Sequence, residues 1–63
     1  MLYVDGEWTG WDGDTLVTLT DGSMWHQDEY YYEYRYACRP KVVIVNGKMQ
    51  VNGMRKAVRV QRM

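Results

Sequence analysis

The sequence predicts an all-β fold, and three observations carry that prediction. Glycine follows Asp or Asn at five positions, and such dipeptides favour positive φ and close tight hairpins. The runs between these turns are short and rich in β-branched and aromatic residues, which favour strands. No segment has apolar residues at a helical period over a useful length. The turn dipeptides end at Gly6, Gly13, Gly22, Gly47 and Gly53.

The strands are expected between these turns. Asp21-Gly22 and Asn46-Gly47 each have a strand-like run on both sides, so both are predicted to close hairpins. Pro40 lacks a backbone N–H, so we expect it at a corner or at the start of a strand. Residues 27–32 have room for one helical turn, but three consecutive tyrosines favour a strand. The predicted strands cover about residues 2–9, 14–20, 23–27, 29–38, 41–46, 48–52 and 57–62.

The length of the chain limits which β-sheet architectures are possible. Sixty-three residues make one domain. Short strands joined by tight turns predict a rolled-up sheet, and a small SH3-like barrel of five to six short antiparallel strands fits this length. The alternative is an OB-fold, which usually needs more residues and a helix. We therefore predict a single small β-barrel domain that spans residues 1–63.

The core must be built from unusual residues. Phenylalanine is absent and leucine occurs only three times, so bulk must come from three tryptophans, six tyrosines, five methionines and the valines. We expect at least two tryptophans to fill the interior, and Trp25, which follows a predicted turn, to be a core residue. So small a barrel cannot bury all of these side chains. The aromatic surface left over predicts a homodimer or other homo-oligomer.

The charges are segregated along the chain. All eight acidic residues precede all eight basic residues, and the net charge is zero. Both halves are rich in strand-forming residues, so neither is a charged tail. We therefore expect N-terminal acids to pair with C-terminal bases within the fold. Each exposed pair contributes only about 0–1 kcal/mol, so the effect is diffuse and sensitive to salt.

Alternating tyrosines are the first candidate for a functional site. Exposed, they would form a stacking platform for single-stranded nucleic acid or an aromatic groove for an extended peptide. Buried, they would replace the missing phenylalanines, and we favour this interpretation because aromatic residues at strand spacing usually pack in a core. Glu29 and Glu33 on the same predicted strand argue against phosphate binding there. The alternating residues, which share one face of that strand, are Tyr30, Tyr32, Tyr34 and Tyr36.

Two further groups complete the candidates. Arg55, Lys56 and Arg59 would form a phosphate-contacting edge, or else a solvated strand face that pairs with acidic residues; the zero net charge favours the second interpretation. Trp11 stands beside Asp12 and Asp14, and such an acidic, aromatic loop would suit a proline-rich peptide or a cationic side chain. The candidate ligand-binding residues are therefore the four tyrosines together with these three basic residues.

Nothing in the sequence indicates an enzyme. His26 is the only histidine, no cysteine lies at ligand spacing from it, and a zinc site is not expected. Ser23 belongs to a turn motif, and no glycine-rich phosphate loop or dinucleotide fingerprint is present. We expect no cofactor and no metal. We predict a non-enzymatic binding or protein-interaction module; the alternatives are single-stranded nucleic-acid binding and an active site completed between subunits.

The cysteine content and the short apolar runs of the sequence predict the cellular compartment. Cys38 is the only cysteine, which favours a reducing compartment. No signal sequence is recognisable, and the longest apolar run, Val42–Val45, is far shorter than the roughly 18 residues of a membrane span. We therefore expect a cytoplasmic protein without a membrane partner.

The segment from Leu19 to Ile44 carries a resemblance to a known group of domains. It contains a Leu-x-Asp-Gly-x-x-Trp turn at residues 19–25, then the alternating tyrosines, then Arg-Pro-x-Val at residues 39–42. In this order the motifs resemble those of small uncharacterised bacterial SH3-like β-barrel domains. The resemblance implies a single small barrel. It implies no activity and no catalytic residue.

Overall fold

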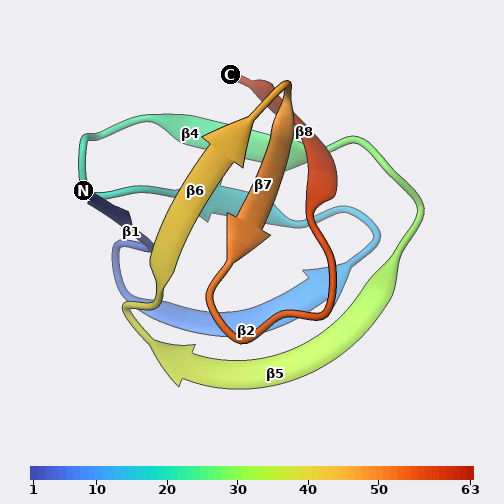
Figure 1. Cartoon of the computed structure of the whole chain (residues 1–63), viewed down its shortest axis with the longest axis horizontal. Coiled ribbons are helices and arrows are strands. Elements are labelled where there is room, and N and C mark those ends of the chain that lie inside the picture. The colour runs from blue at the N-terminus through green and yellow to red at the C-terminus, as the bar shows by residue number, and fades with distance from the viewer.

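The computed structural model describes all 63 residues and contains strands and turns but no helix (Figure 1). Every strand pairing is antiparallel. The prediction of an all-β fold made of short antiparallel strands is confirmed. The strands are β1 Leu2–Tyr3, β2 Glu7–Asp12, β3 Leu16–Thr18, β4 Met24–Gln27, β5 Tyr32–Cys38, β6 Lys41–Val45, β7 Lys48–Val51 and β8 Val58–Arg62.

Six strands form one curled sheet, in the order β1-β6-β7-β8-β4-β3. Its two edges meet, because Val4 and Leu19 form an antiparallel bridge just beyond β1 and β3. The bridge is flanked by two main-chain hydrogen bonds, from Asp5 N to the Thr18 carbonyl at 2.8 Å and from Thr20 N to the Tyr3 carbonyl at 2.9 Å. The other two strands, β2 and β5, form a separate ribbon that curves along one side of the molecule (Figure 1).

The ribbon leaves the curled sheet at a corner where two chain segments bend together. The strand predicted over residues 2–9 is interrupted at Asp5-Gly6, so that prediction is wrong: β1 ends at Tyr3, and β2 begins at Glu7 and runs on to Asp12. The facing segment bends at Arg39, whose φ is 50°, and Pro40 then leads into β6, as expected for a proline at a corner. Arg39 N donates to the Gly6 carbonyl at 2.9 Å and holds the two bends together.

Both predicted hairpin turns are present. Asn46 and Gly47 have φ of 53° and 77° between the paired residues Val45 and Lys48, which is the geometry of a two-residue hairpin with positive φ at both central positions. The other turn joins β3 to β4. There Oδ1 of Asp21 accepts hydrogen bonds from the backbone N–H and the hydroxyl of Ser23. Short polar side chains that bond to nearby backbone groups stabilise such turns.

The core contains two of the three tryptophans. Trp8 and Trp11 of β2 are buried, and their rings meet edge to face with centroids 4.9 Å apart. This confirms that at least two tryptophans fill the interior. Trp25 is only partly buried: it packs against the margin of the core, its Nε1 donates to the Ser23 hydroxyl at 2.9 Å, and Arg62 lies over its ring. The buried core residues are Val4, Trp8, Trp11, Val17, Leu19, Val42, Met49, Val51, Met54, Val58 and Val60.

The interpretation of the alternating tyrosines as core is wrong. Their strand, β5, has β2 as its only partner, and the space beneath the ribbon is already occupied by Trp8 and Trp11. The residues packed against this core from β5 and its approach are Tyr31 and Ala37, which belong to the opposite face from the four tyrosines. The strand also begins later than predicted, at Tyr32. The Gln27 amide donates to two carbonyls of the preceding segment, at Glu29 and Tyr31, and holds it as a loop.

Acidic and basic residues pair across the fold, as their segregation along the chain predicts. Three ion pairs join the two halves, and all are at least partly exposed, so each contributes about 0–1 kcal/mol. The pairs are Asp5–Arg39 at 3.9 Å, Asp28–Arg59 at 3.7 Å and Glu29–Lys56 at 2.5 Å.

Candidate functional site: the tyrosine stripe

The outer face of the β2–β5 ribbon carries four exposed tyrosines, which we call the tyrosine stripe. Because side chains alternate along a strand, those of β5 point away from the core at every second residue. The fourth tyrosine, Tyr30, lies two residues before the start of β5. These side chains are far more exposed than aromatic residues in a core would be. The exposed fractions are 86% for Tyr30, 61% for Tyr32, 79% for Tyr34 and 54% for Tyr36.

Contacts within the ribbon hold parts of the stripe in place. The Tyr36 hydroxyl donates to Oε2 of Glu7 at 2.6 Å. The rings of Tyr30 and Tyr32 meet edge to face, with centroids 5.4 Å apart. The hydrogen bond to Glu7 raises the pKa of Tyr36, and the adjacent Tyr30 side chain raises the pKa of Tyr32. Both phenols therefore stay protonated at neutral pH.

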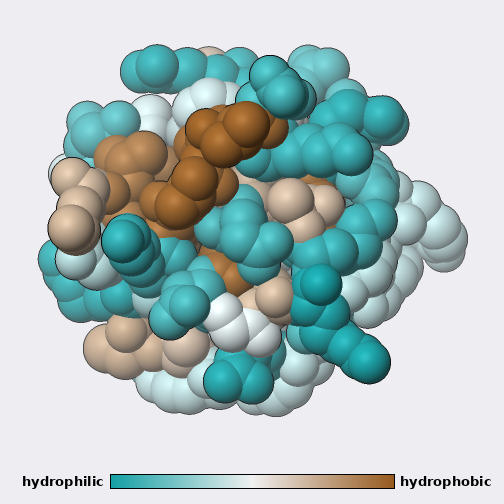
Figure 2. Space-filling model, viewed as in Figure 1, coloured by the Kyte–Doolittle hydropathy of each residue, from teal (hydrophilic) through white to brown (hydrophobic).

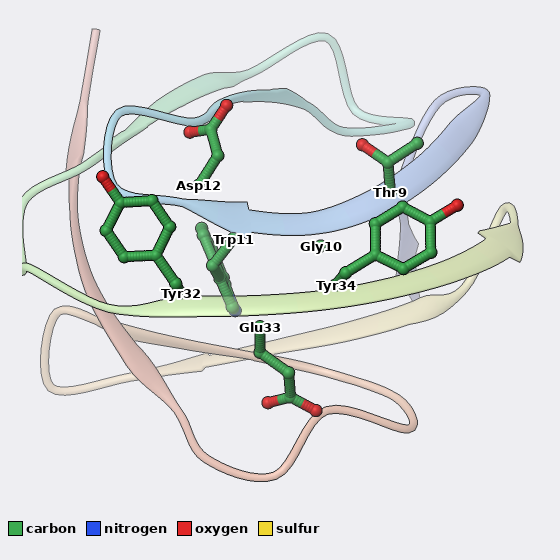
Figure 3. A pocket seen from close by; sticks show the side chains of 7 residues that line it. All are labelled: Thr9, Gly10, Trp11, Asp12, Tyr32, Glu33 and Tyr34. Carbon is green, nitrogen blue, oxygen red and sulfur yellow. The ribbon is translucent and has the colours of Figure 1, made fainter.

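A shallow hollow of about 350 Å³ opens on this face. Figure 3 shows the Tyr32 ring lying toward Asp12 and the Tyr34 ring toward Thr9, with Gly10 between them. Without a side chain at Gly10 the floor is bare backbone, and the two rings stand as walls on either side. The residues that line the hollow are Thr9, Gly10, Trp11, Asp12, Tyr32, Glu33 and Tyr34.

Gly10 is required by the close approach of the two strands. Its φ is 108°, a conformation that side chains strongly disfavour. A Cβ at this position would collide with the carbonyl oxygen of Glu33 and lie 2.9 Å from Arg35 N. The register of the ribbon shifts between Trp8 and Gly10, as in a β-bulge. The same glycine therefore allows the strands to pair and leaves the hollow open.

Asp12 places an oriented carboxylate at one end of the hollow. Its Oδ1 accepts hydrogen bonds from Asp14 N at 2.9 Å and from the Thr15 hydroxyl at 2.8 Å. These two bonds lower the pKa of Asp12, with the one from the Asp14 backbone the stronger cause. The carboxylate is therefore ionised at neutral pH, and its second oxygen, Oδ2, forms no hydrogen bond within the protein.

The three predicted basic residues do not join the stripe. In Figure 3 the Glu33 side chain points to the opposite side of β5 from Tyr32 and Tyr34, and on that side its Oε1 accepts from Arg55 N at 3.1 Å. Nearby, Lys56 pairs with Glu29. Arg59 donates from its backbone N–H to the Glu29 carboxylate and from its side chain to the Asp28 carbonyl. The structure thus gathers the four tyrosines on one surface and places Arg55, Lys56 and Arg59 among carboxylates on another.

Sequence reasoning did not identify Glu7, Thr9 and Gly10 as part of this surface. One signal was available for the glycine: it is the only glycine that follows neither Asp nor Asn, and it lies between two tryptophans. A glycine without a turn residue before it, inside a strand, often marks a bulge or a close backbone approach. The contribution of Glu7 depends on the strand register and has no local signature.

Two other polar side chains, those of His26 and Ser23, have hydrogen-bond partners that account for them structurally. His26 Nε2 lies 2.5 Å from Oδ1 of Asp14, in an exposed pair. The Ser23 hydroxyl is buried between Asp21 and Trp25 and has hydrogen bonds to both. No three His, Cys, Asp or Glu side chains come together as metal ligands, and the chain forms no helix long and apolar enough to cross a membrane.

Comparisons with protein-family models, with curated proteins and with solved structures find no match to this chain.

Proposed function

We propose that this chain is a non-enzymatic binding module, built on a small SH3-like barrel, whose ligand-binding surface is the tyrosine stripe. The observation that carries the proposal is the exposure of four aromatic side chains on one face of a chain that has no phenylalanine and three leucines. Packing does not account for large side chains left outside so small a core. Contiguous exposed aromatic surface usually marks an interaction site.

The shape of the two sheets supports the assignment to an SH3-like barrel. Six antiparallel strands curl until their edges meet, and the β2–β5 ribbon continues the curvature after bends at Gly6 and Arg39. A small barrel of short, bent strands is the architecture that the length of the chain and the spacing of its turns favour.

The charges near the stripe favour a peptide or protein ligand over nucleic acid. Glu7 bonds to one member of the stripe and Asp12 lies beside another. Phosphates would be repelled by these carboxylates, whereas nucleic-acid platforms combine aromatic residues with cations that track the backbone. Binding of single-stranded nucleic acid through the stripe and the basic C-terminal strand thus has less support, because Lys56 and Arg59 already contact carboxylates elsewhere.

The test is a nuclear magnetic resonance titration of ¹⁵N-labelled protein with three probes: a proline-rich peptide, an arginine-containing glycine-serine peptide and single-stranded oligothymidylate. We expect a peptide to shift the amide resonances of β2 and β5 in a saturable way. Tyr34→Ser should weaken that binding, and Val45→Ser, which alters an exposed residue of β6, should not. The proposal fails if none of the probes shifts the resonances of the stripe at millimolar concentration.

A further inference from the structure

The hollow over Gly10 has the dimensions of a site for one side chain. Its volume of about 350 Å³ is near the lower end of the roughly 300–1,000 Å³ range of small-molecule pockets, and it is open to solvent along the ribbon. Two aromatic walls, Tyr32 and Tyr34, stand on either side of a backbone floor (Figure 3). Such a shape suits a long, unbranched side chain lying across the ribbon.

We propose that this hollow binds the side chain of an arginine from an extended basic segment of a partner protein. The aliphatic part of the arginine lies over Gly10, between the rings of Tyr32 and Tyr34, and the guanidinium group contacts Asp12. This inference rests on the proposed function, because it specifies the ligand of the same surface.

The hydrogen bonds of Asp12 give the first argument. Its Oδ1 is held by Asp14 N and the Thr15 hydroxyl, so the carboxylate is oriented before any ligand arrives. Its Oδ2 remains available to accept a hydrogen bond. A hydrogen bond to an ionised group is about twice as strong as one between neutral groups, and a cationic donor adds direct charge attraction to the Asp12 carboxylate. An oriented acceptor also lowers the entropy lost on binding.

The tyrosine walls give the second argument, and they favour arginine over lysine. A cation over the face of an aromatic ring is attracted by the ring quadrupole, and arginine is found in this position more often than lysine. The guanidinium group is planar and weakly hydrated, so it stacks on a ring while its N–H groups donate within the plane. The ring beside Asp12 is that of Tyr32 (Figure 3), which is 61% exposed and accessible for such stacking, while Tyr34 contacts the aliphatic part of the side chain.

The protein supplies no cation of its own to this hollow. The basic residue nearest along β5 is Arg35, which belongs to the opposite face of the strand. Its side chain lies against Gly53, where an added Cβ would come within 2.5 Å of the Arg35 Nε. No basic residue lines the hollow. The negative charge of Asp12 is therefore complementary to a cation from another molecule.

The experiment compares two fluorescent glycine-serine peptides by anisotropy. One has alternating arginines and the other has citrulline, the neutral isostere of arginine, at the same positions. We expect the arginine peptide to bind about tenfold more tightly, because citrulline keeps N–H donors but lacks the positive charge that the Asp12 carboxylate and the tyrosine faces attract. Asp12→Asn should reduce that affinity by a similar factor. Asp28→Asn is the matched control, since it removes the same charge from a carboxylate whose partners are Gln61 and Arg59.

Tyr34→Ser provides a second variant at the site, because Asp12 also orders a turn. Thermal melts establish that each variant is folded before its affinity is compared. Equal affinity for the arginine and citrulline peptides, or equal effects of Asp12→Asn and Asp28→Asn, would overturn the arginine site. So would binding of oligothymidylate in place of the arginine peptide. If the proline-rich or citrulline peptide still shifts the resonances of the stripe, the proposed binding module stands while its arginine ligand is rejected.

Discussion

The hydroxyl of Tyr36 on β5 donates a hydrogen bond to Oε2 of Glu7 on β2, with 2.6 Å between the two oxygen atoms. These residues lie 29 positions apart in the sequence, and their bond crosses the outer face of the ribbon. It fixes one end of the tyrosine stripe, and Asp12 lies at the hollow between Tyr32 and Tyr34. The stripe is thus accompanied by carboxylates on β2.

Replacing Glu7 with glutamine should lower the pKa of Tyr36, because the bond to the carboxylate is the main cause that raises it. A phenol whose folded-state pKa is raised contributes stability below its unfolded value of about 10, and that stability is lost as the pH rises through the folded value. In an alkaline titration followed by tyrosinate absorbance, we therefore expect Glu7→Gln to ionise one tyrosine earlier. Asp28→Asn, at a carboxylate with no tyrosine partner, should leave the titration curve unchanged. An unshifted curve for Glu7→Gln would contradict the contact.

Local sequence patterns predicted much of the fold and little of the site. Asn46-Gly47 and Asp21-Gly22 specify their turns through local conformation, so both could be found without knowing the rest of the chain. The alternation of tyrosines gave their common face correctly, but alternation does not say which face is buried. That was decided by Trp8 and Trp11 on the partner strand, which fill the space beneath the ribbon. The hollow depends on the register that brings Gly10 opposite Tyr34, a long-range relationship.

Acid should destabilise the fold below about pH 4.5. The hydrogen bond from Lys56 lowers the pKa of Glu29, and the bond from Tyr31 lowers that of Glu33. A carboxyl whose pKa is lowered by folding contributes stability above its unfolded value, and that stability is lost as the pH falls through the folded value. We expect the melting temperature to decrease from about pH 5 to about pH 3, and Glu29→Gln to reduce that decrease. Equal pH dependence in the variant and the parent protein would show that Glu29 is not part of this effect.

The tryptophans should differ in their contributions to stability. Trp8 is buried and its Nε1 donates to the Met54 sulfur at 3.3 Å, whereas Trp25 is only partly buried. Trp8→Ala should cost about 3–5 kcal/mol, which is most of the roughly 3–9 kcal/mol expected for a domain of this size. Trp25→Ala should cost clearly less. Urea unfolding measures both, and Trp8→Phe keeps the comparison possible if the alanine variant does not fold. A larger loss of stability for Trp25→Ala than for Trp8→Ala would mean that the centre of the core lies at Trp25 and not at Trp8.

Gly10→Ala should destabilise the protein by more than about 1 kcal/mol, since the change adds a Cβ at positive φ and against the Glu33 carbonyl. Gly22→Ala is a matched control: its φ is 86°, but nothing lies within 4 Å of the added Cβ. The difference between the two variants in thermal unfolding therefore measures the close approach of β2 and β5, apart from the backbone conformation. Equal losses of stability would indicate that the strands separate to accept the methyl group at little cost.

Self-association is expected, and the charges of the ribbon indicate where it should occur. In a two-fold contact each copy presents the same patch, so a contact between two tyrosine stripes would bring Asp12 and Glu7 of both copies together. The curled sheet offers a different surface, the apolar area over β6 in Figure 2, where Val43 and Val45 are 50% and 60% exposed. We therefore expect sedimentation velocity to show a mass that rises with concentration in the micromolar range.

Val45→Lys should reduce that rise, because it places a charge in the apolar patch beside Lys48, its partner in the β6–β7 pairing. Tyr34→Ser should leave the rise unchanged, because the stripe lies on the separate β2–β5 ribbon. The two variants thereby assign self-association and ligand binding to different surfaces. A monomeric mass at every concentration would reject self-association, and an effect of Tyr34→Ser alone would move the contact to the stripe. In that second case a copy of the chain would compete with the basic peptide, and peptide affinity would fall as protein concentration rises.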